Sequence, residues 1–255
     1  MILIDDPLHG DRIDATKSMY PSDLIALKTS WYDNDQARTV YGFVVTGAAT
    51  VDLDGMRAVL KAGDYFVCPD KLEVQPHPDS LVVVIRRFGF RGMIQLGRIE
   101  QRGRLSYIDG CSDTLLVMPP RLGDPCFNHL HFPPTIVQTQ HTHPSIRLGM
   151  VIGGAGTAFG PGWEKPLLPG AVFLLEEQEL HSFRTDKPTR KRTPEEVEAF
   201  MIANPEYDVE YISSERLPMT PVGMDVIAFH PDSDWGPTDQ AHPMRNRTYL
   251  GTDGI

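Results

Sequence analysis

The sequence is poor in cysteine and in basic residues. Only three of its 255 residues are cysteines, an odd number with no CxxC spacing, which is typical of reduced thiols in a cytosolic protein and not of a disulfide framework. Lysine and arginine number 24 against 34 acidic residues, so the formal net charge is −10. A surface of that charge repels nucleic-acid phosphates and anionic lipid headgroups. We therefore expect neither nucleic acid nor membrane among the partners of this chain.

Signals for export and for membrane insertion are also missing. The first residues, MILIDDPLHG, carry acid where a signal peptide carries base, and their apolar run is too short for one. No apolar stretch reaches the length that a transmembrane helix needs. These features, together with the unpaired cysteines, predict a cytoplasmic location.

Several sequence motifs of common enzyme classes are absent. The chain has no GxGxxG after a strand, no GxxxxGK[ST], no GxSxG and no HExxH. These absences argue against dinucleotide, P-loop, serine-hydrolase and zincin chemistry. Any catalytic function must rest on a different set of residues.

What the sequence does contain is a repeated β pattern. Glycine and proline each occur 22 times among short runs of Val, Ile, Phe and Tyr, which predicts many turns and a mostly β fold. The segments VYGFVVTGAATVDLDGMRAVLKAGDYFVCP and RLGMVIGGAGTAFGPGWEKPLLPGAVFLLE share one order: apolar strand, small residues, hairpin, glycine turn and apolar strand. This weak repeat of about 110 residues predicts two β modules, spanning 1–104 and 105–255.

The second module is expected to carry one short helix near its C-terminal end. Thr193 is a suitable N-cap, Pro194 suits the first helical position, and Glu196 lies three residues after the cap. These signals predict a helix over 193–203. The polar segment 230–247 contains His and Asp at spacings that fit no metal site, so we expect it to pack over a barrel or against a second subunit.

Histidine is scarce but clustered. Four of the nine histidines lie within fifteen residues, and a fifth follows 38 residues later; the five are His129, His131, His141, His143 and His181. Residues i and i+2 of a strand point to the same side, so His141 and His143 can bind one ion together. A third imidazole from a neighbouring strand would complete a facial site with open positions for substrate or water.

The region from Phe127 to Arg184 resembles the cupin superfamily. His141-Thr142-His143-Pro144 matches its first motif, and the segment from Pro169-Gly170 to His181-Ser182-Phe183 matches its second. The resemblance implies two cupin-type double-stranded β-helix (jelly-roll) barrels, an all-β fold apart from the short helix. It also implies that His141, His143 and His181 are metal ligands.

This region departs from the family pattern at two places. Arg147 or Leu148 stands where the family often has a glutamate ligand, so the resemblance implies a three-His site without a carboxylate. The Pro-x-Gly that usually precedes the last histidine is replaced by the five residues 176–180, three of which are acidic. We expect these acidic residues to form a solvated turn.

The first half resembles a cupin barrel that has lost its metal. When the repeats are aligned, Asp33 to Ala37 stand where the HxH motif should be, and Glu73 or Val74 falls near the position of the last histidine. The chain is therefore interpreted as a bicupin with one degenerate, metal-free barrel.

Three further residues are candidates for catalytic roles. His129 and His131 alternate on the strand before the HxH motif and could line the pocket as proton shuttles or substrate contacts. They could also be structural, or be the true ligand pair. Arg147 could anchor a substrate carboxylate through its planar fork, or could form a salt bridge with Glu176 or Glu177.

Within the cupin resemblance, three-His sites are commonly ferrous and activate O₂ toward a chelating substrate. The leading hypothesis is an iron-dependent oxygenase, in particular a dioxygenase, acting on a small polar or aromatic acid. Mn, Ni or Zn would also suit imidazole ligands. The alternatives are a non-redox metalloenzyme (lyase, isomerase or hydrolase) and a non-catalytic small-ligand-binding bicupin. Exposed barrel edges make a homodimer plausible.

Overall fold

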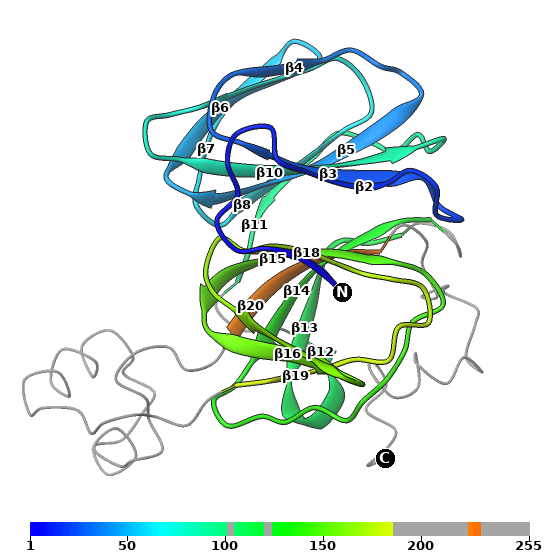
Figure 1. Cartoon of the computed structure of the whole chain (residues 1–255). Helices are drawn as coiled ribbons and strands as arrows, with labels where there is room; N and C mark the ends of the chain where they lie inside the picture. Colours follow the sequence, from blue (N-terminus) through cyan, green and yellow to red (C-terminus); the bar gives the residue numbers. More distant parts are fainter. Residues whose placement is uncertain (101–104, 120–123, 186–223, 231–255) are drawn as a thin grey trace, which may run out of the picture.

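The computed structural model describes residues 1–100, 105–119, 124–185 and 224–230. Within these ranges the chain forms antiparallel β-sheets and a single 3-10 turn at Ile108–Gly110, which confirms the predicted all-β class (Figure 1). The helix predicted over 193–203 lies outside the described residues. Within the same described ranges, no helix has the length and hydropathy needed to cross a membrane.

The first half contributes a large and a small sheet that face one another. The six-stranded sheet has the order β11-β8-β5-β10-β3-β2, and the four-stranded sheet has the order β4-β9-β6-β7. Their strands are β2 (Arg12–Ala15), β3 (Ser22–Leu27), β4 (Trp31–Asp33), β5 (Arg38–Thr46), β6 (Ala48–Leu53), β7 (Met56–Lys61), β8 (Asp64–Cys68), β9 (Leu72–Pro76), β10 (Leu81–Phe88) and β11 (Gln95–Arg98).

The second half repeats this arrangement. A seven-stranded sheet has the order β1-β18-β15-β20-β14-β13-β12, and a three-stranded sheet has the order β17-β16-β19. Their strands are β1 (Ile2–Ile4), β12 (Leu105–Ser106), β13 (Ser112–Val117), β14 (Cys126–Phe132), β15 (Arg147–Gly154), β16 (Gly156–Gly160), β17 (Trp163–Leu167), β18 (Val172–Leu175), β19 (Ser182–Arg184) and β20 (Met224–His230).

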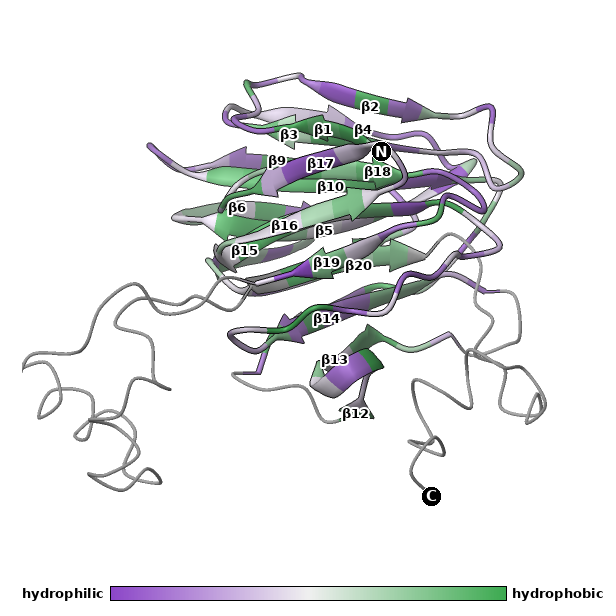
Figure 2. Ribbon diagram, turned by 60° about the horizontal axis from the view of Figure 1, so that its bottom comes forward, coloured by the Kyte–Doolittle hydropathy of each residue, from purple (hydrophilic) through white to green (hydrophobic). Residues whose placement is uncertain are grey.

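Both large sheets are covered on both faces, and this explains their unbroken apolar runs. Alternate residues of one strand point to opposite faces. On β10, Val82 packs inside the first half while Val83 packs against the second half. Almost every residue of β5 is buried for this reason, and β10 and β15 are coloured largely hydrophobic in Figure 2.

An apolar layer between the large sheets joins the two halves. Tyr41 of β5 packs its ring against Phe127 and Phe229, with centroids 6.0 and 4.7 Å apart. The Tyr65 hydroxyl donates a hydrogen bond of 2.9 Å to the Leu116 carbonyl. Strand β1, although first in sequence, pairs with β18 of the second half. The boundary at residue 104 stays a prediction, because residues 101–104 are outside the described ranges.

The internal repeat holds to the level of single residues. Gly42 is opposite Phe66 in the first half, and Gly149 is opposite Phe173 in the second, so both members of the pair recur after 107 residues. A Cβ atom on Gly42 would lie 2.0 Å from the Phe66 ring, and one on Gly149 would lie 2.3 Å from the Phe173 ring. Because glycine has no side chain, each of these glycines leaves room for the ring of the facing phenylalanine to lie over its backbone.

This contact predicts a cost for a single methyl group. Gly149→Ala should lower the free energy of unfolding by about 1–3 kcal/mol, because Phe173 is packed too tightly to move aside. Urea denaturation measures the change. The double variant Gly149→Ala/Phe173→Leu should be more stable than the sum of the two single effects predicts, since the smaller side chain leaves room for the methyl group. An unchanged midpoint in Gly149→Ala would contradict the packing described.

Candidate metal centre

Three histidines meet at one end of the second half. His141 and His181 form an isolated antiparallel bridge, with backbone N–H···O distances of 2.9 and 3.0 Å. His143 follows two residues later and its carbonyl accepts the Gln178 N–H at 2.8 Å. The three ring centroids are 4.6 to 5.1 Å apart. The structure thus brings together the three residues that the sequence predicts as ligands.

Backbone hydrogen bonds set the tautomers of two of these rings. The Nδ1 atom of His141 lies 2.9 Å from the Thr139 carbonyl, and that of His181 lies 2.7 Å from the Glu179 carbonyl. A carbonyl can only accept, so Nδ1 carries the hydrogen in both rings. The Nε2 atoms then hold the free lone pairs, which is the form that binds a metal.

Burial keeps these imidazoles neutral. The side chain of His181 is 1% exposed, and its Nε2 atom has no hydrogen-bond partner among the described residues. Desolvation, followed by the proximity of His141, lowers the pKa of His181 to about 3. Desolvation also lowers the pKa of His141. Both rings are therefore uncharged near neutral pH, and the lone pair of His181 faces no donor from the described part of the chain.

This arrangement fits a divalent ion. The three ligand atoms all lie within 4.8 Å of one another. Imidazole nitrogens bind such ions at about 2.1 Å, so any two of them are at most about 4.2 Å apart around one ion. Small rotations of the rings would close the site. A buried acceptor without a donor is costly, and a metal ion would satisfy it.

Arg147 is buried inside the same half. It is the first residue of β15 and is paired with Leu175, whose side chain belongs to the interior cluster. Its side chain is 4% exposed. One guanidinium nitrogen, Nη1, donates to the Ser145 carbonyl and hydroxyl and to the Ile146 carbonyl at 2.8 to 3.2 Å.

The environment of Arg147 leaves its charge uncompensated within the described part of the chain. Its Nε atom is buried without a hydrogen-bond partner there. No ion pair joins it to any described carboxylate, so the predicted alternative of a salt bridge to Glu176 or Glu177 is not formed. The positive charge lies near enough to the histidines to contribute to the lowered pKa of both His141 and His181.

The structure does not bring His129 and His131 to this cluster. Both lie on β14, where His129 is opposite Ile227, a residue of the layer between the halves. The intervening Leu130 belongs to the interior cluster of the second half. By alternation, the two histidines face away from the three-His site. Any catalytic role for them stays a prediction that this geometry does not support.

Sequence reasoning missed a residue that supports His141 from a distance. Asp109, in the 3-10 turn, accepts the backbone N–H of Thr139 at 2.5 Å. The carbonyl of Thr139 in turn accepts Nδ1–H of His141. Because the link runs through a backbone amide, no sequence motif signals it. Asp109 has a positive φ of 54°, which its short polar side chain tolerates.

The corresponding position in the first half has different side chains, and none of them is a histidine. Trp31 pairs with Val74 there, as His141 pairs with His181 in the second half. Two residues after Trp31, Asp33 is ion-paired with the buried Arg38 at 2.8 Å and lies 3.5 Å from Arg86. Val74 is one of the two residues that alignment placed near the last histidine position. That this barrel binds no metal stays a prediction.

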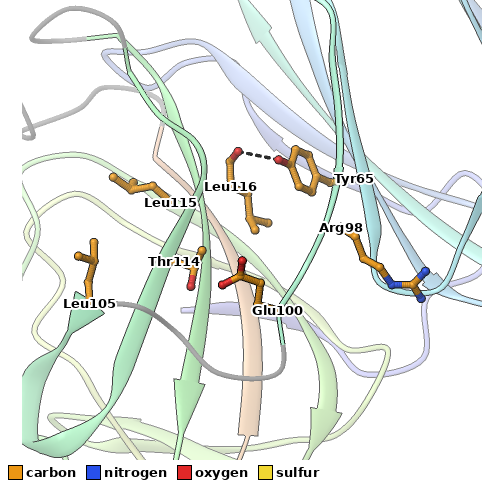
Figure 3. Close-up of a pocket in the computed structure, with 7 residues that line it drawn as sticks. All are labelled: Tyr65, Arg98, Glu100, Leu105, Thr114, Leu115 and Leu116. Atoms are coloured by element: carbon orange, nitrogen blue, oxygen red, sulfur yellow. Dashed lines mark hydrogen bonds between the residues drawn. The ribbon is translucent and has the colours of Figure 1, made fainter.

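A separate cavity of about 310 Å³ lies where the two halves meet (Figure 3). Its lining combines apolar side chains with Arg98 and Glu100, and the hydrogen bond from Tyr65 to Leu116 crosses one side of it. Arg98 is already paired with Asp64 at 3.4 Å. The cavity contains none of the three histidines, so the geometry of the imidazoles, and not this hollow, identifies the candidate site.

The three cysteines form no disulfide, as the sequence predicts, and all three are buried. Cys111 accepts a hydrogen bond of 3.6 Å from the Gln138 amide, and burial raises the pKa of its thiol to about 12. Burial also raises the pKa of Cys68. These thiols are therefore packing residues at neutral pH and not candidate nucleophiles.

Comparison with known proteins shows which solved structures share this fold. No family model and no curated protein matches the sequence. Among solved structures, the E. coli protein Ylba is 13% identical, with a TM-score of 0.58 over 91% of this chain and 88% of that one. A cupin 2 conserved barrel domain protein from Leptotrichia buccalis is 11% identical, with a TM-score of 0.53 over 89% and 95%.

Salicylate 1,2-dioxygenase from Pseudaminobacter salicylatoxidans is a further match. It is 12% identical, with a TM-score of 0.55 over 82% of this chain and 70% of that one. Such identities establish the fold and not an activity. Over most of its length the chain therefore has the fold of the cupin barrel proteins, as the sequence resemblance implied.

The three-His geometry predicts the effect of removing one ligand. His181→Ala should lose the bound ion while the fold survives, with a loss of about 1–2 kcal/mol in the free energy of unfolding. Elemental analysis and circular dichroism measure the two effects. His129→Ala and the exposed His77→Ala should keep the wild-type metal content. Full metal stoichiometry in His181→Ala would remove this residue from the ligand set.

The Asp109 contact predicts a remote effect on metal affinity. Asp109→Gly tolerates the positive φ but removes the acceptor that fixes Thr139, so metal affinity should fall about 10- to 100-fold, as for other supporting residues of metal ligands. Asp109→Asn keeps an acceptor oxygen and should stay near the wild-type value. Equal affinities in all three proteins, measured by competition with a chelator, would show that this contact does not support the site.

Proposed function

We propose that this chain is a metal-dependent oxygenase, most simply a ferrous dioxygenase, that acts on a small polar or aromatic acid. One observation carries the proposal. Three imidazoles converge in the second half, and near them lies a buried arginine without a described carboxylate partner. This combination supplies a metal site with open positions and a cation suited to an acidic substrate.

The three histidines would hold the ion and leave one side of it open. A bound ferrous ion would supply the activation of O₂, and Mn, Ni or Zn would suit the same ligands. The backbone of the chain would keep the imidazole rings in position. The His141–His181 bridge fixes two ligands relative to each other, and the carbonyls of Thr139 and Glu179 keep both rings in the metal-binding tautomer.

Arg147 would orient the substrate through its carboxylate. Its planar guanidinium can bind both oxygens of a carboxylate, and its burial makes that contact strong. The wall of the site beside His181 is aromatic, because Phe183 packs at 5.7 Å from the His181 ring and contacts Phe132 at 5.4 Å. Such a wall excludes water and suits the ring of an aromatic acid.

The test begins with metal-free protein prepared under nitrogen and reconstituted separately with Fe(II), Mn(II), Ni(II) and Zn(II). O₂ uptake is then followed with a panel of small acids. Salicylate and gentisate come first, because structural neighbours are named as a salicylate 1,2-dioxygenase and its complex with gentisate. We expect substrate-dependent O₂ uptake with Fe(II), and none in His141→Ala reconstituted in the same way.

Other results would point to other functions. Turnover with Mn, Ni or Zn and without O₂ uptake would identify a non-redox metalloenzyme. Binding of an acid that survives complete removal of the metal, with no turnover under any condition, would identify a ligand-binding module. Either result would overturn the oxygenase assignment.

A further inference from the structure

The interior of the second half contains a cation next to a site for another cation. Arg147 contributes one positive charge, and a divalent ion held by the three histidines would add two more. No carboxylate belongs to the three-His group, and none pairs with Arg147, within the described parts of the chain. In a medium of low dielectric constant, like charges at short range repel strongly.

The hydrogen bonds of Arg147 do not relieve this repulsion. Its Nη1 atom donates only to neutral oxygens, those of Ser145 and Ile146. Its Nε atom is buried and donates to no described group. The guanidinium is therefore held in place by Ser145 and Ile146, while its Nε–H still lacks an acceptor among the described residues.

The geometry points to an anion that binds between the two cations. We infer that a carboxylate-bearing ligand and the metal ion bind cooperatively, with the carboxylate in contact with both the ion and Arg147. This inference rests on the proposed function, because it takes the three-His group as the metal site. It adds that the substrate supplies the carboxylate that Arg147 lacks among the described residues.

Cooperativity of this kind is reciprocal. If the carboxylate tightens metal binding by some factor, the metal tightens carboxylate binding by the same factor. Couplings between two ligands of one protein commonly amount to about 5- to 150-fold. We therefore expect the metal to bind weakly alone and about 10- to 100-fold more tightly at saturating carboxylate, which would also restrict the loaded ion to the substrate complex.

The experiment measures metal affinity with and without a simple carboxylate. Metal-free protein is titrated with Co(II), whose visible absorption reports coordination, in the presence of benzoate or of benzamide as a neutral analogue of the same shape. We expect benzoate to tighten Co(II) binding and benzamide to leave it unchanged. In the reverse titration, Co(II) should tighten benzoate binding by the same factor.

Variants at Arg147 separate charge from shape. Arg147→Gln removes the cation, so Co(II) should bind more tightly than to wild type without benzoate, and the effect of benzoate should disappear. Arg147→Glu places a carboxylate in the interior and should bind Co(II) most tightly of all, again without a benzoate effect. Arg147→Lys keeps the charge but not the fork, so it should bind Co(II) as weakly as wild type when benzoate is absent.

The outcomes distinguish this inference from the proposal on which it rests. Equal Co(II) affinity of wild type with benzoate, with benzamide and with neither would overturn the coupling while leaving the metal site intact. If wild type and all three variants, folded by circular dichroism, bind no Co(II) under any condition, the metal site itself fails and the inference fails with it. A benzoate effect that persists in Arg147→Gln would assign the carboxylate contact to another residue.

Discussion

The candidate site depends on the two backbone hydrogen bonds that join His141 to His181. These bonds fix two ligands that are 40 residues apart in the sequence, and they do so without involving either side chain. The rings are then free to turn their Nδ1 atoms to local carbonyls and their Nε2 atoms to a shared point. The site is therefore a property of strand pairing first and of histidine chemistry second. A pairing shifted by one residue would turn His181 to the other side of its strand.

The first half shows what the same pairing supports when the side chains differ. Its Trp31–Val74 pair occupies the place of the His141–His181 pair, and the interior behind it is a continuous apolar cluster. Asp33, two residues after Trp31, is already neutralised by Arg38 and Arg86. The two halves thus handle buried charge in opposite ways: the first closes its ion pairs internally, whereas the second leaves Arg147 without a described carboxylate.

Much of the fold and the ligand set could be predicted from sequence, because both are evident from the spacing of particular residues along the chain. The 107-residue recurrence of the Gly–Phe pair and the HxH spacing require no knowledge of distant contacts. The face of the sheet toward which His129 and His131 point could not be predicted. Alternation shows that the two side chains lie on the same side of β14, but it does not show which side that is. Their register opposite β20, a strand more than 90 residues later, decides it. Asp109 escaped notice because it acts on a backbone N–H, for which any nearby acceptor would serve.

The second half buries several polar atoms that have no hydrogen-bond partner among the described residues. An unpaired donor or acceptor in the interior costs about 1–3 kcal/mol, and the second half holds such atoms on Arg147, His181 and Gln138 within its described part. The layer between the large sheets is built mainly from aromatic and branched side chains of both halves. Strand β1 also crosses from one half to pair with β18, which leads into the turn before His181. The first half therefore provides an apolar sheet face against which the second half packs.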